Sequence, residues 1–130
     1  MPRVSILMSV YNGEKTLQES LNSIYRQSYT DWELIIINDC STDNSPDILS
    51  SAKAIFYNIK IITNSQNIGL TKSLNKGLLH CSGEYVARID ADDSWNKDKL
   101  RKQVAFLDSN DTYGLVATNS FVIDIKGVNR

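Results

Sequence analysis

Val4-Ser5-Ile6-Leu7-Met8-Ser9-Val10-Tyr11-Asn12-Gly13 is the stretch that decides the fold of this chain. Residues 4–10 are rich in apolar and β-branched side chains, and the run stops at the turn signal Tyr11-Asn12-Gly13. A short apolar run bounded by a turn predicts a strand that is buried on both faces. Such strands are typical of parallel sheets covered by helices on each side, so this stretch favours an α/β fold.

Helical and strand patterns alternate along the rest of the chain. Leu17, Leu21 and Ile24 have the spacing of a buried helical stripe, and Thr16 stands three residues before Glu19, as in a capping box. The same reasoning predicts strands over residues 32–38, 59–63, 85–89 and 113–123. It predicts one helix from N-cap Ser45 and Pro46 to about Lys53, a second along Leu70, Leu74 and Leu78, and a third along Leu100, Val104 and Leu107. Four βα units and a final strand predict a doubly wound, mainly parallel sheet with helices on both faces, a Rossmann-like arrangement.

The C-terminal residues predict that this domain is incomplete. Residues 122–128 have the pattern of a strand, a turn at Gly127 and the first residue of a returning strand. The rest of that returning strand is missing from the sequence. We therefore expect residues 1–130 to form a single domain that is the N-terminal portion of a larger unit.

Composition excludes several classes of protein. The chain has 130 residues, a net charge of −1 and two cysteines, Cys40 and Cys81. A chain of this length can bury a core without disulfides or a structural metal, and its charge balance argues against nucleic-acid binding. No apolar run is long enough to span a bilayer or to serve as a signal sequence. These features predict a cytoplasmic protein, with membrane association only peripheral and at the cytoplasmic face.

Polar side chains gather where the predicted strands end. Tyr11, Asn12 and Glu14 follow the first strand, and Asp39 follows the second. Asn64 follows the third strand, and the acidic group at residues 90–93 follows the fourth. Ligands of open parallel sheets bind outside the carboxyl ends of the strands, and the predicted strand starts show no comparable cluster. The sequence therefore predicts a binding site at this edge.

Three carboxylates stand within the four residues Asp90-Ala91-Asp92-Asp93. Such carboxylates repel one another unless a cation joins them, and hard oxygen ligands suit Mg²⁺ or Mn²⁺. Mg²⁺ is usually held by one or two carboxylates together with substrate phosphates, which suggests a nucleoside diphosphate as the ligand. An equally simple interpretation is that the acidic residues only cap the helix that follows.

The common glycine-rich phosphate loops are absent. Neither G-x-G-x-x-G after the first strand nor G-x-x-x-x-G-K-[ST] occurs. This absence weakens the dinucleotide-binding and P-loop interpretations. A divalent cation can take over the role of such a loop by neutralising the phosphates directly.

Four motifs, in order, resemble the inverting family 2 glycosyltransferases with the GT-A fold. The opening stretch at residues 4–13 is similar to the first strand of that family, and Ile37-Asn38-Asp39-Cys40-Ser41-Thr42-Asp43 resembles its second motif. Asn67-Ile68-Gly69 with Asn75-Lys76-Gly77 resembles the third, and residues 83–93 resemble the segment that carries the D-x-D signature. The resemblance covers nearly the whole chain and implies transfer of a sugar from a nucleotide-diphosphate sugar to an acceptor hydroxyl.

The resemblance also implies roles for individual residues. Tyr11 would lie against the nucleobase, Asp39 would accept a hydrogen bond from the base edge, and Asp90 would face the ribose. Asp92, with Asp93 beside it, would bind the Mg²⁺ or Mn²⁺ that bridges the two phosphates. The implied donor is a UDP-sugar, and the implied acceptor is a saccharide or a lipid-linked glycan. Asn12 and Glu14 belong to the same donor-binding loop.

The catalytic base of the family has no counterpart in this sequence. Family members carry this acidic residue in the second half of the domain, so we assign no catalytic residue here and expect a donor-binding part that transfers poorly alone. A non-catalytic nucleotide-sugar-binding remnant would share every motif. A receiver-like signalling domain is the other alternative, but it would need an acidic pair after the first strand and an aspartate after the third, where this chain has Tyr11-Asn12-Gly13-Glu14 and Thr63-Asn64-Ser65.

Overall fold

The computed structural model describes residues 1–123, which form an α/β fold around a four-stranded parallel sheet. The strand order in the sheet is β3-β2-β1-β4. The strands are β1 (Val4–Val10), β2 (Trp32–Asn38), β3 (Ile59–Thr63) and β4 (Tyr85–Arg88). The order reverses at β1, which has β2 on one side and β4 on the other. The doubly wound sheet expected from the sequence is confirmed.

The register brings the carboxyl ends of the strands to one edge. Val10 lies opposite Asn38, and Asn38 lies opposite Thr63, so β1, β2 and β3 end at the same level. The amide of Ile89 donates to the carbonyl of Leu7, which carries β4 along β1 to the beginning of the acidic segment. The four loops that follow these strands therefore leave the sheet at the same edge.

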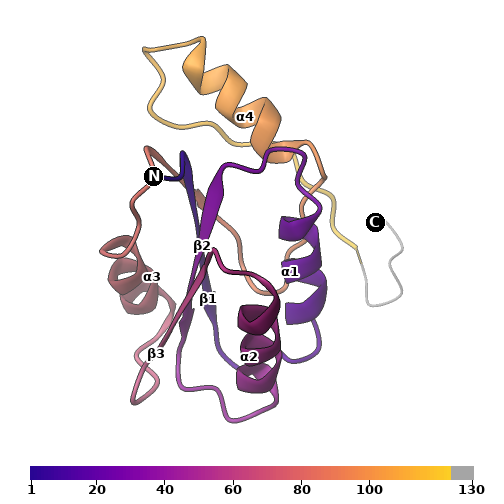
Figure 1. Cartoon of the computed structure of the whole chain (residues 1–130), viewed down its shortest axis with the longest axis vertical. Coiled ribbons are helices and arrows are strands. Elements are labelled where there is room, and N and C mark those ends of the chain that lie inside the picture. Colours follow the sequence, from indigo (N-terminus) through magenta and orange to yellow (C-terminus); the bar gives the residue numbers. More distant parts are fainter. Residues whose placement is uncertain (124–130) are drawn as a thin grey trace.

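Helices cover both faces of the sheet (Figure 1). The helices α1 (Leu17–Tyr25) and α2 (Ser45–Ile55) lie on one face, and α3 (Leu70–Leu78) lies on the other. The stripe expected on α1 is fully buried in the core, where it packs with apolar side chains of the sheet. The fourth helix, α4 (Lys99–Asp108), lies at the opposite end of the sheet from the carboxyl ends of the strands, and Arg3 just before β1 pairs with Asp108.

The leucines of α3 lie along one side of the helix, as expected, but this side is not its buried face. Ser73 and Gly77 are the buried residues of α3, whereas Leu70 and Leu78 remain 49% and 46% exposed. A Cβ atom at Gly77 would collide with the side chain of Leu7 and would crowd Ile37. The small residues thus allow α3 to pack closely on the sheet, and this close approach turns the leucine stripe away from it.

The prediction of a strand over residues 113–123 is wrong. The structure has no strand there, only an isolated bridge at Ile123, and Leu115, Phe121 and Val122 are largely exposed. A strand needs a neighbour that completes its hydrogen-bond ladder, and this segment has none among the described residues. The expected hairpin at 122–128 lies mostly outside the described residues.

Two helix starts differ from the expected caps because their hydroxyl groups bind other loops. Thr16 makes no capping bond, and its Oγ1 donates instead to the carbonyl of Ala91 at 3.0 Å. The helix α2 begins at Ser45, with Asn44 as its N-cap, and extends to Ile55. The Oγ of Ser45 accepts a hydrogen bond from the amide of Gly13 at 2.9 Å. Both hydroxyls join loops at the carboxyl edge of the sheet.

None of the helices within residues 1–123 has the length and apolar character that crossing a bilayer requires.

Candidate functional site at the carboxyl edge of the sheet

The loops after β1 and β2 are bound to each other through Asn12. Its Oδ1 accepts hydrogen bonds from the amide of Thr42 at 2.8 Å and from the Thr42 hydroxyl at 3.3 Å. The amide of Asn12 donates to Oγ of Ser41 at 3.0 Å. Asn12, one of the expected ligand-binding residues, therefore acts in this structure as a link between the two loops.

Glu14 makes a second link between the same loops. Its Oε2 accepts from the amide of Asn44 at 3.1 Å, and its own amide donates to Oδ2 of Asp43 at 3.0 Å. The other oxygen of Asp43 accepts from the amide of Ser45 at 2.8 Å. These reciprocal bonds satisfy polar groups at the start of α2 and hold the opening loop in one position.

Asp39 organises the loop that follows β3. Its side chain is buried, and Oδ1 accepts from the Asn64 side-chain amide at 2.9 Å and from the Ile68 amide at 2.8 Å. Oδ2 accepts from the amide of Gly69 at 2.9 Å. These three bonds use both carboxylate oxygens of Asp39 to hold the segment that leads from β3 to α3.

The hydrogen bonds of Asp39 decide its ionisation. Burial by itself would raise the pKa of this carboxyl, but the amides of Ile68, Asn64 and Gly69 and the Ser73 hydroxyl outweigh burial and lower the pKa. Asp39 is therefore ionised at neutral pH. A negative charge at the end of β2 holds the loop between β3 and α3.

The acidic turn after β4 is held by the start of α1. The Oγ of Ser20 contacts the carbonyl oxygens of Ala91, at 2.8 Å, and Asp93. Thr16 donates to the same Ala91 carbonyl, so Thr16 and Ser20 together hold the backbone of the turn against the start of α1. A Cβ atom at Gly13 would lie 3.6 Å from Cβ of Ala91, so the turn also packs against the β1 loop. Contacts thus join all four loops at this edge into one continuous rim.

The three carboxylates of the turn converge. Asp90, Asp92 and Asp93 each offer an oxygen, and these oxygens all lie within 4.8 Å of one another. The Arg88 guanidinium donates from Nε and Nη2 to Oδ1 of Asp90, at 3.2 and 3.1 Å, which partly balances the charge. A compact set of hard oxygen donors fits Mg²⁺ or Mn²⁺.

The carboxylates of the turn repel one another. Partial burial, and then the charges of Asp92 and Asp90, raise the pKa of the Asp93 carboxyl above its usual value. A bound divalent cation would replace this repulsion by attraction, so the donor set and its charge both suit a metal.

Two non-glycine residues of the rim have a left-handed backbone. Asn12 has φ 51° and Cys40 has φ 62°, and neither is glycine. Asparagine adopts this region readily, whereas cysteine does so at a cost that the surrounding contacts must offset. Asn12 directly follows Tyr11, and Cys40 directly follows Asp39. The strained backbone therefore lies next to these two site residues.

Tyr11 is the aromatic side chain that the β1 loop offers to solvent. It is 53% exposed, in contrast to Val10, which ends β1 in the core. An exposed ring fixed between a buried strand and a cross-linked loop can provide a flat surface for stacking.

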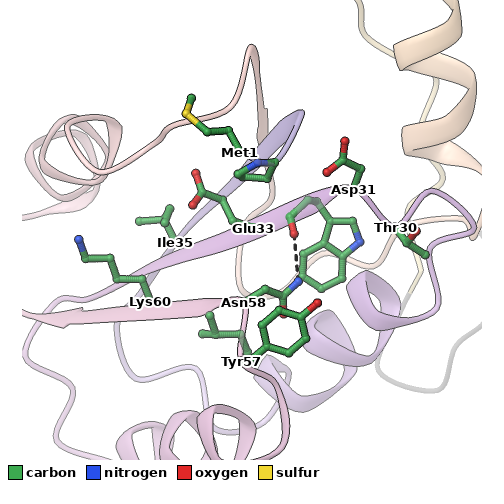
Figure 2. A pocket seen from close by; sticks show the side chains of 11 residues that line it. Met1, Thr30, Asp31, Glu33, Ile35, Tyr57, Asn58 and Lys60 are labelled. Atoms are coloured by element: carbon green, nitrogen blue, oxygen red, sulfur yellow. Dashed lines mark hydrogen bonds between the residues drawn. The ribbon is translucent and has the colours of Figure 1, made fainter.

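A hollow lies at the other end of the strands (Figure 2). Its volume is about 510 Å³, and its walls include Trp32 and Ile59, the first residues of β2 and β3. The side-chain amide of Asn58 donates to the carbonyl of Trp32 across its floor at 3.0 Å. Ligands of parallel sheets bind at the carboxyl ends of the strands, so we assign the functional site to the rim and not to this hollow.

The structure places the expected residues in two groups on the rim. Tyr11, Asn12, Glu14 and Asp39 belong to the mutually bonded loops after β1 and β2, and the three aspartates of residues 90–93 form the turn after β4. Asn64 was expected at this edge, and the structure adds its bond to Asp39. The sequence did not predict a role in the site for the other supporting side chains: Thr16, Ser20, Ser41, Asp43 and Ser45. These polar residues cluster between segments with hydrophobic periodicity, which indicates loops. The pattern does not reveal their hydrogen-bond partners, because these are distant in sequence.

A doubly wound sheet with cross-linked loops at its carboxyl edge defines the class of open α/β domains that bind their ligands at this edge. Residues 5–128 match the sequence profile of glycosyl transferase family 2. The chain therefore belongs to glycosyl transferase family 2.

Relatives by sequence span nearly the whole chain. EpsE of Bacillus subtilis (strain 168) is 45% identical over 128 residues, which are 98% of this chain and 46% of EpsE. The UDP-Glc:α-D-GlcNAc-diphosphoundecaprenol β-1,3-glucosyltransferase WfgD of Escherichia coli is 33% identical over 126 residues, 92% of this chain and 49% of WfgD. The chain thus spans about half the length of these relatives.

Solved structures share the fold. The crystal structure of residues 1–349 of Staphylococcus aureus TarS in complex with UDP-GlcNAc superposes with a TM-score of 0.79 and 32% identity, covering 84% of this chain and 32% of that one. The mannosyltransferase PcManGT of Pyrobaculum calidifontis in complex with GDP-Man and Mn²⁺ gives a TM-score of 0.76 and 29% identity, covering 82% of this chain and 32% of that one. The GT-A-like fold expected from the sequence is confirmed.

Proposed function

We propose that this chain is the donor-binding part of a glycosyltransferase that moves a sugar from a UDP-sugar to an acceptor hydroxyl with inversion. The observation that carries the proposal is the convergence of Asp90, Asp92 and Asp93 on a rim that also exposes Tyr11 and holds the buried Asp39. Relatives crystallised with UDP-GlcNAc and with GDP-Man and Mn²⁺ support a nucleotide-sugar donor and a divalent cation.

Each rim residue has a proposed task. Tyr11 stacks on the nucleobase, and Asp39, at the end of β2, accepts a hydrogen bond from the base edge. Asp90, held by Arg88, faces the ribose. Asn12 and Glu14 serve the donor by fixing the loop that carries Tyr11.

Asp92, with Asp93 beside it, is proposed to hold Mg²⁺ or Mn²⁺. When bound there, such a cation neutralises the diphosphate and makes it a better leaving group. The protein contributes geometry, because Ser20 and Thr16 fix the backbone of the turn before the donor arrives.

Transfer is proposed as a direct displacement. The acceptor oxygen forms a bond to the anomeric carbon as the bond from that carbon to the diphosphate oxygen breaks, which inverts the configuration. We assign the base that takes the acceptor proton to no residue of this chain and propose that the chain alone binds donor but transfers little. A saccharide or a lipid-linked glycan is the proposed acceptor, in line with the diphosphoundecaprenol-linked substrate in the name of WfgD.

Calorimetry with UDP and Mn²⁺ tests this proposal. Wild-type protein should bind UDP in the presence of Mn²⁺, and Asp92→Ala should lose at least about tenfold in affinity, because one lost metal ligand removes more than about 1.4 kcal/mol. Asp111→Ala changes an exposed aspartate outside the site and serves as the matched control. Equal affinity in Asp92→Ala and wild type would refute the metal role, and a panel of GDP, dTDP and CDP tests the choice of base.

A further inference from the structure

Three polar side chains form a continuous chain of hydrogen bonds from α3 to the end of β2. The ammonium group of Lys76, in the last turn of α3, donates to Oδ1 of Asn64 at 2.8 Å. The side-chain nitrogen Nδ2 of Asn64 donates to Oδ1 of Asp39 at 2.9 Å and to Oγ of Ser73 at 3.1 Å. Lys76 therefore contacts Asp39 indirectly, through a single side-chain amide.

The amide of Asn64 is held in one orientation by its partners at both ends. Its side chain is buried, with 4% of its surface exposed. A lysine ammonium can only donate and a carboxylate can only accept, so the amide oxygen must face Lys76 and the amide nitrogen must face Asp39. The second hydrogen of Nδ2 is taken by Ser73. Turning the amide over would break all three bonds.

The close packing of α3 on the sheet brings this chain of side chains together. Ser73 is fully buried, and a Cβ atom at Gly77 would collide with the side chain of Leu7. Because these two small residues form the buried face of α3, the helix lies close to the sheet, and Lys76 can reach Asn64. The segment Asn75-Lys76-Gly77, which has no part in the donor contacts proposed above, thus supplies both the small residue that permits this approach and the lysine that uses it.

A simpler role for Lys76 is an interaction with the helix dipole, since a positive charge near the C-terminus of a helix is favourable. A lysine with that role alone would keep its ammonium group in water. Lys76 is instead partly buried, and its Nζ donates to the side-chain oxygen of a buried residue outside the helix. Without Lys76 this buried oxygen would lose its donor, and an unpaired buried acceptor is costly.

We propose that Lys76 is a positioning residue for base recognition: by fixing the amide of Asn64, it sets the orientation of the Asp39 carboxylate toward the nucleobase. This inference rests on the proposed function, in which Asp39 accepts a hydrogen bond from the base edge. Uracil offers a ring N–H to a carboxylate, whereas the corresponding ring nitrogen of cytosine is an acceptor. A site built to bind an N–H group rejects an analogue that lacks it, so Lys76 controls the preference for UDP over CDP.

Calorimetry with UDP and with CDP, each in the presence of Mn²⁺, tests this inference on residues 1–130. Wild-type protein should bind UDP more tightly than CDP, and Lys76→Met should lower the ratio of the two affinities at least about fivefold. Lys76→Arg keeps a charged donor and should keep most of the wild-type ratio. Lys53→Met, which removes an exposed lysine in the last turn of α2, is the matched control and should leave the ratio unchanged.

A double-mutant cycle tests whether Lys76 acts through Asn64. If it does, Lys76→Met should change the UDP to CDP ratio of an Asn64→Ala protein by less than about twofold. An unchanged ratio in Lys76→Met would overturn the inference, and so would an equal loss of affinity for both nucleotides, which a merely structural role would produce. Wild-type protein that failed to bind UDP, or that bound UDP and CDP equally, would instead refute the proposed base recognition and the inference with it.

A second measurement needs neither a nucleotide nor the Asn64 variant. Nuclear magnetic resonance follows the two side-chain amide protons of Asn64, which donate to Asp39 and Ser73. These protons should exchange with solvent at least about tenfold faster in Lys76→Met than in wild type, because the amide is then held from one end only. Equal exchange rates in the two proteins would overturn the positioning role, whatever their affinities for UDP.

Discussion

Replacing Asp39 by asparagine removes the charge that organises the rim while keeping the shape of the side chain. The carboxylate accepts from Asn64 and Ile68 through one oxygen and from Gly69 through the other. An asparagine amide keeps one oxygen, so its NH₂ group must face at least one N–H donor. We expect Asp39→Asn to unfold more easily than wild type.

The size of the effect follows from the bonds lost. A hydrogen bond to a charged group contributes about 1.5–3 kcal/mol, and a buried N–H left unpaired costs about 1–3 kcal/mol. The least disturbed arrangement of the introduced asparagine would lose the bond from Gly69 and leave that amide unpaired. The expected loss is therefore about 3 kcal/mol in the free energy of unfolding, or about 10 °C in Tm for a domain of this size.

The pH dependence separates loss of charge from loss of packing. Because the folded state lowers the pKa of Asp39, its stabilising contribution is fully present above the unfolded pKa of about 3.9 and is lost as the pH falls through the folded value. The difference between wild type and Asp39→Asn should therefore be constant from about pH 7 to about pH 5 and should shrink below about pH 4.

Urea unfolding followed by far-ultraviolet circular dichroism measures this difference at each pH. Asp111→Asn, at an exposed position away from the rim, is the matched control and should not change stability by more than about 0.5 kcal/mol. A difference below about 1 kcal/mol at neutral pH, or one that is the same at about pH 7 and about pH 3, would refute the role of the Asp39 charge in holding the loop after β3.

Two further variants probe the packing and the acidic turn. Gly83→Ala should lower the free energy of unfolding by about 3 kcal/mol or more, because a Cβ there would lie 2.6 Å from the backbone nitrogen of Ser5. Thermal unfolding checks this against the control Gly114→Ala, whose Cβ would meet nothing within 4 Å. Ser20→Ala should cost about 1–2 kcal/mol and weaken Mn²⁺ binding several-fold, since the carbonyl of Ala91 loses a donor. Mn²⁺ titration by calorimetry would contradict this role if the affinity equalled that of wild type.

The layered fold could be predicted because its signals are local. The apolar runs at 4–10 and 32–38 became β1 and β2 with the expected bounds, and the stripe on α1 is buried as its spacing indicates. In these elements the hydrophobic pattern predicts burial correctly, because each element is surrounded by the core. The same signals failed at residues 113–123, where an apolar segment has no pairing partner among the described residues and stays exposed.

The edge that carries the candidate site could be predicted from the sequence, but the contacts within it could not. Parallel strands bring their carboxyl ends to one edge, so the polar residues after each strand were correctly expected there. The partners were not foreseeable: Thr16 has the spacing of a cap yet binds Ala91, and Asn12 binds Thr42 across 30 positions. Such bonds depend on how two loops approach each other in space.

The sequence by itself determined the order of the strands along the chain, the helices between them and the acidic turn at 90–93, because hydrophobic periodicity and turn residues act over short distances. Only the tertiary structure decided which face of α3 is buried and where the hydroxyls of the rim donate. Those outcomes depend on how closely backbones approach, as at Gly77 against Leu7 and Ile37, and a close approach between distant segments leaves no periodic signal in the sequence.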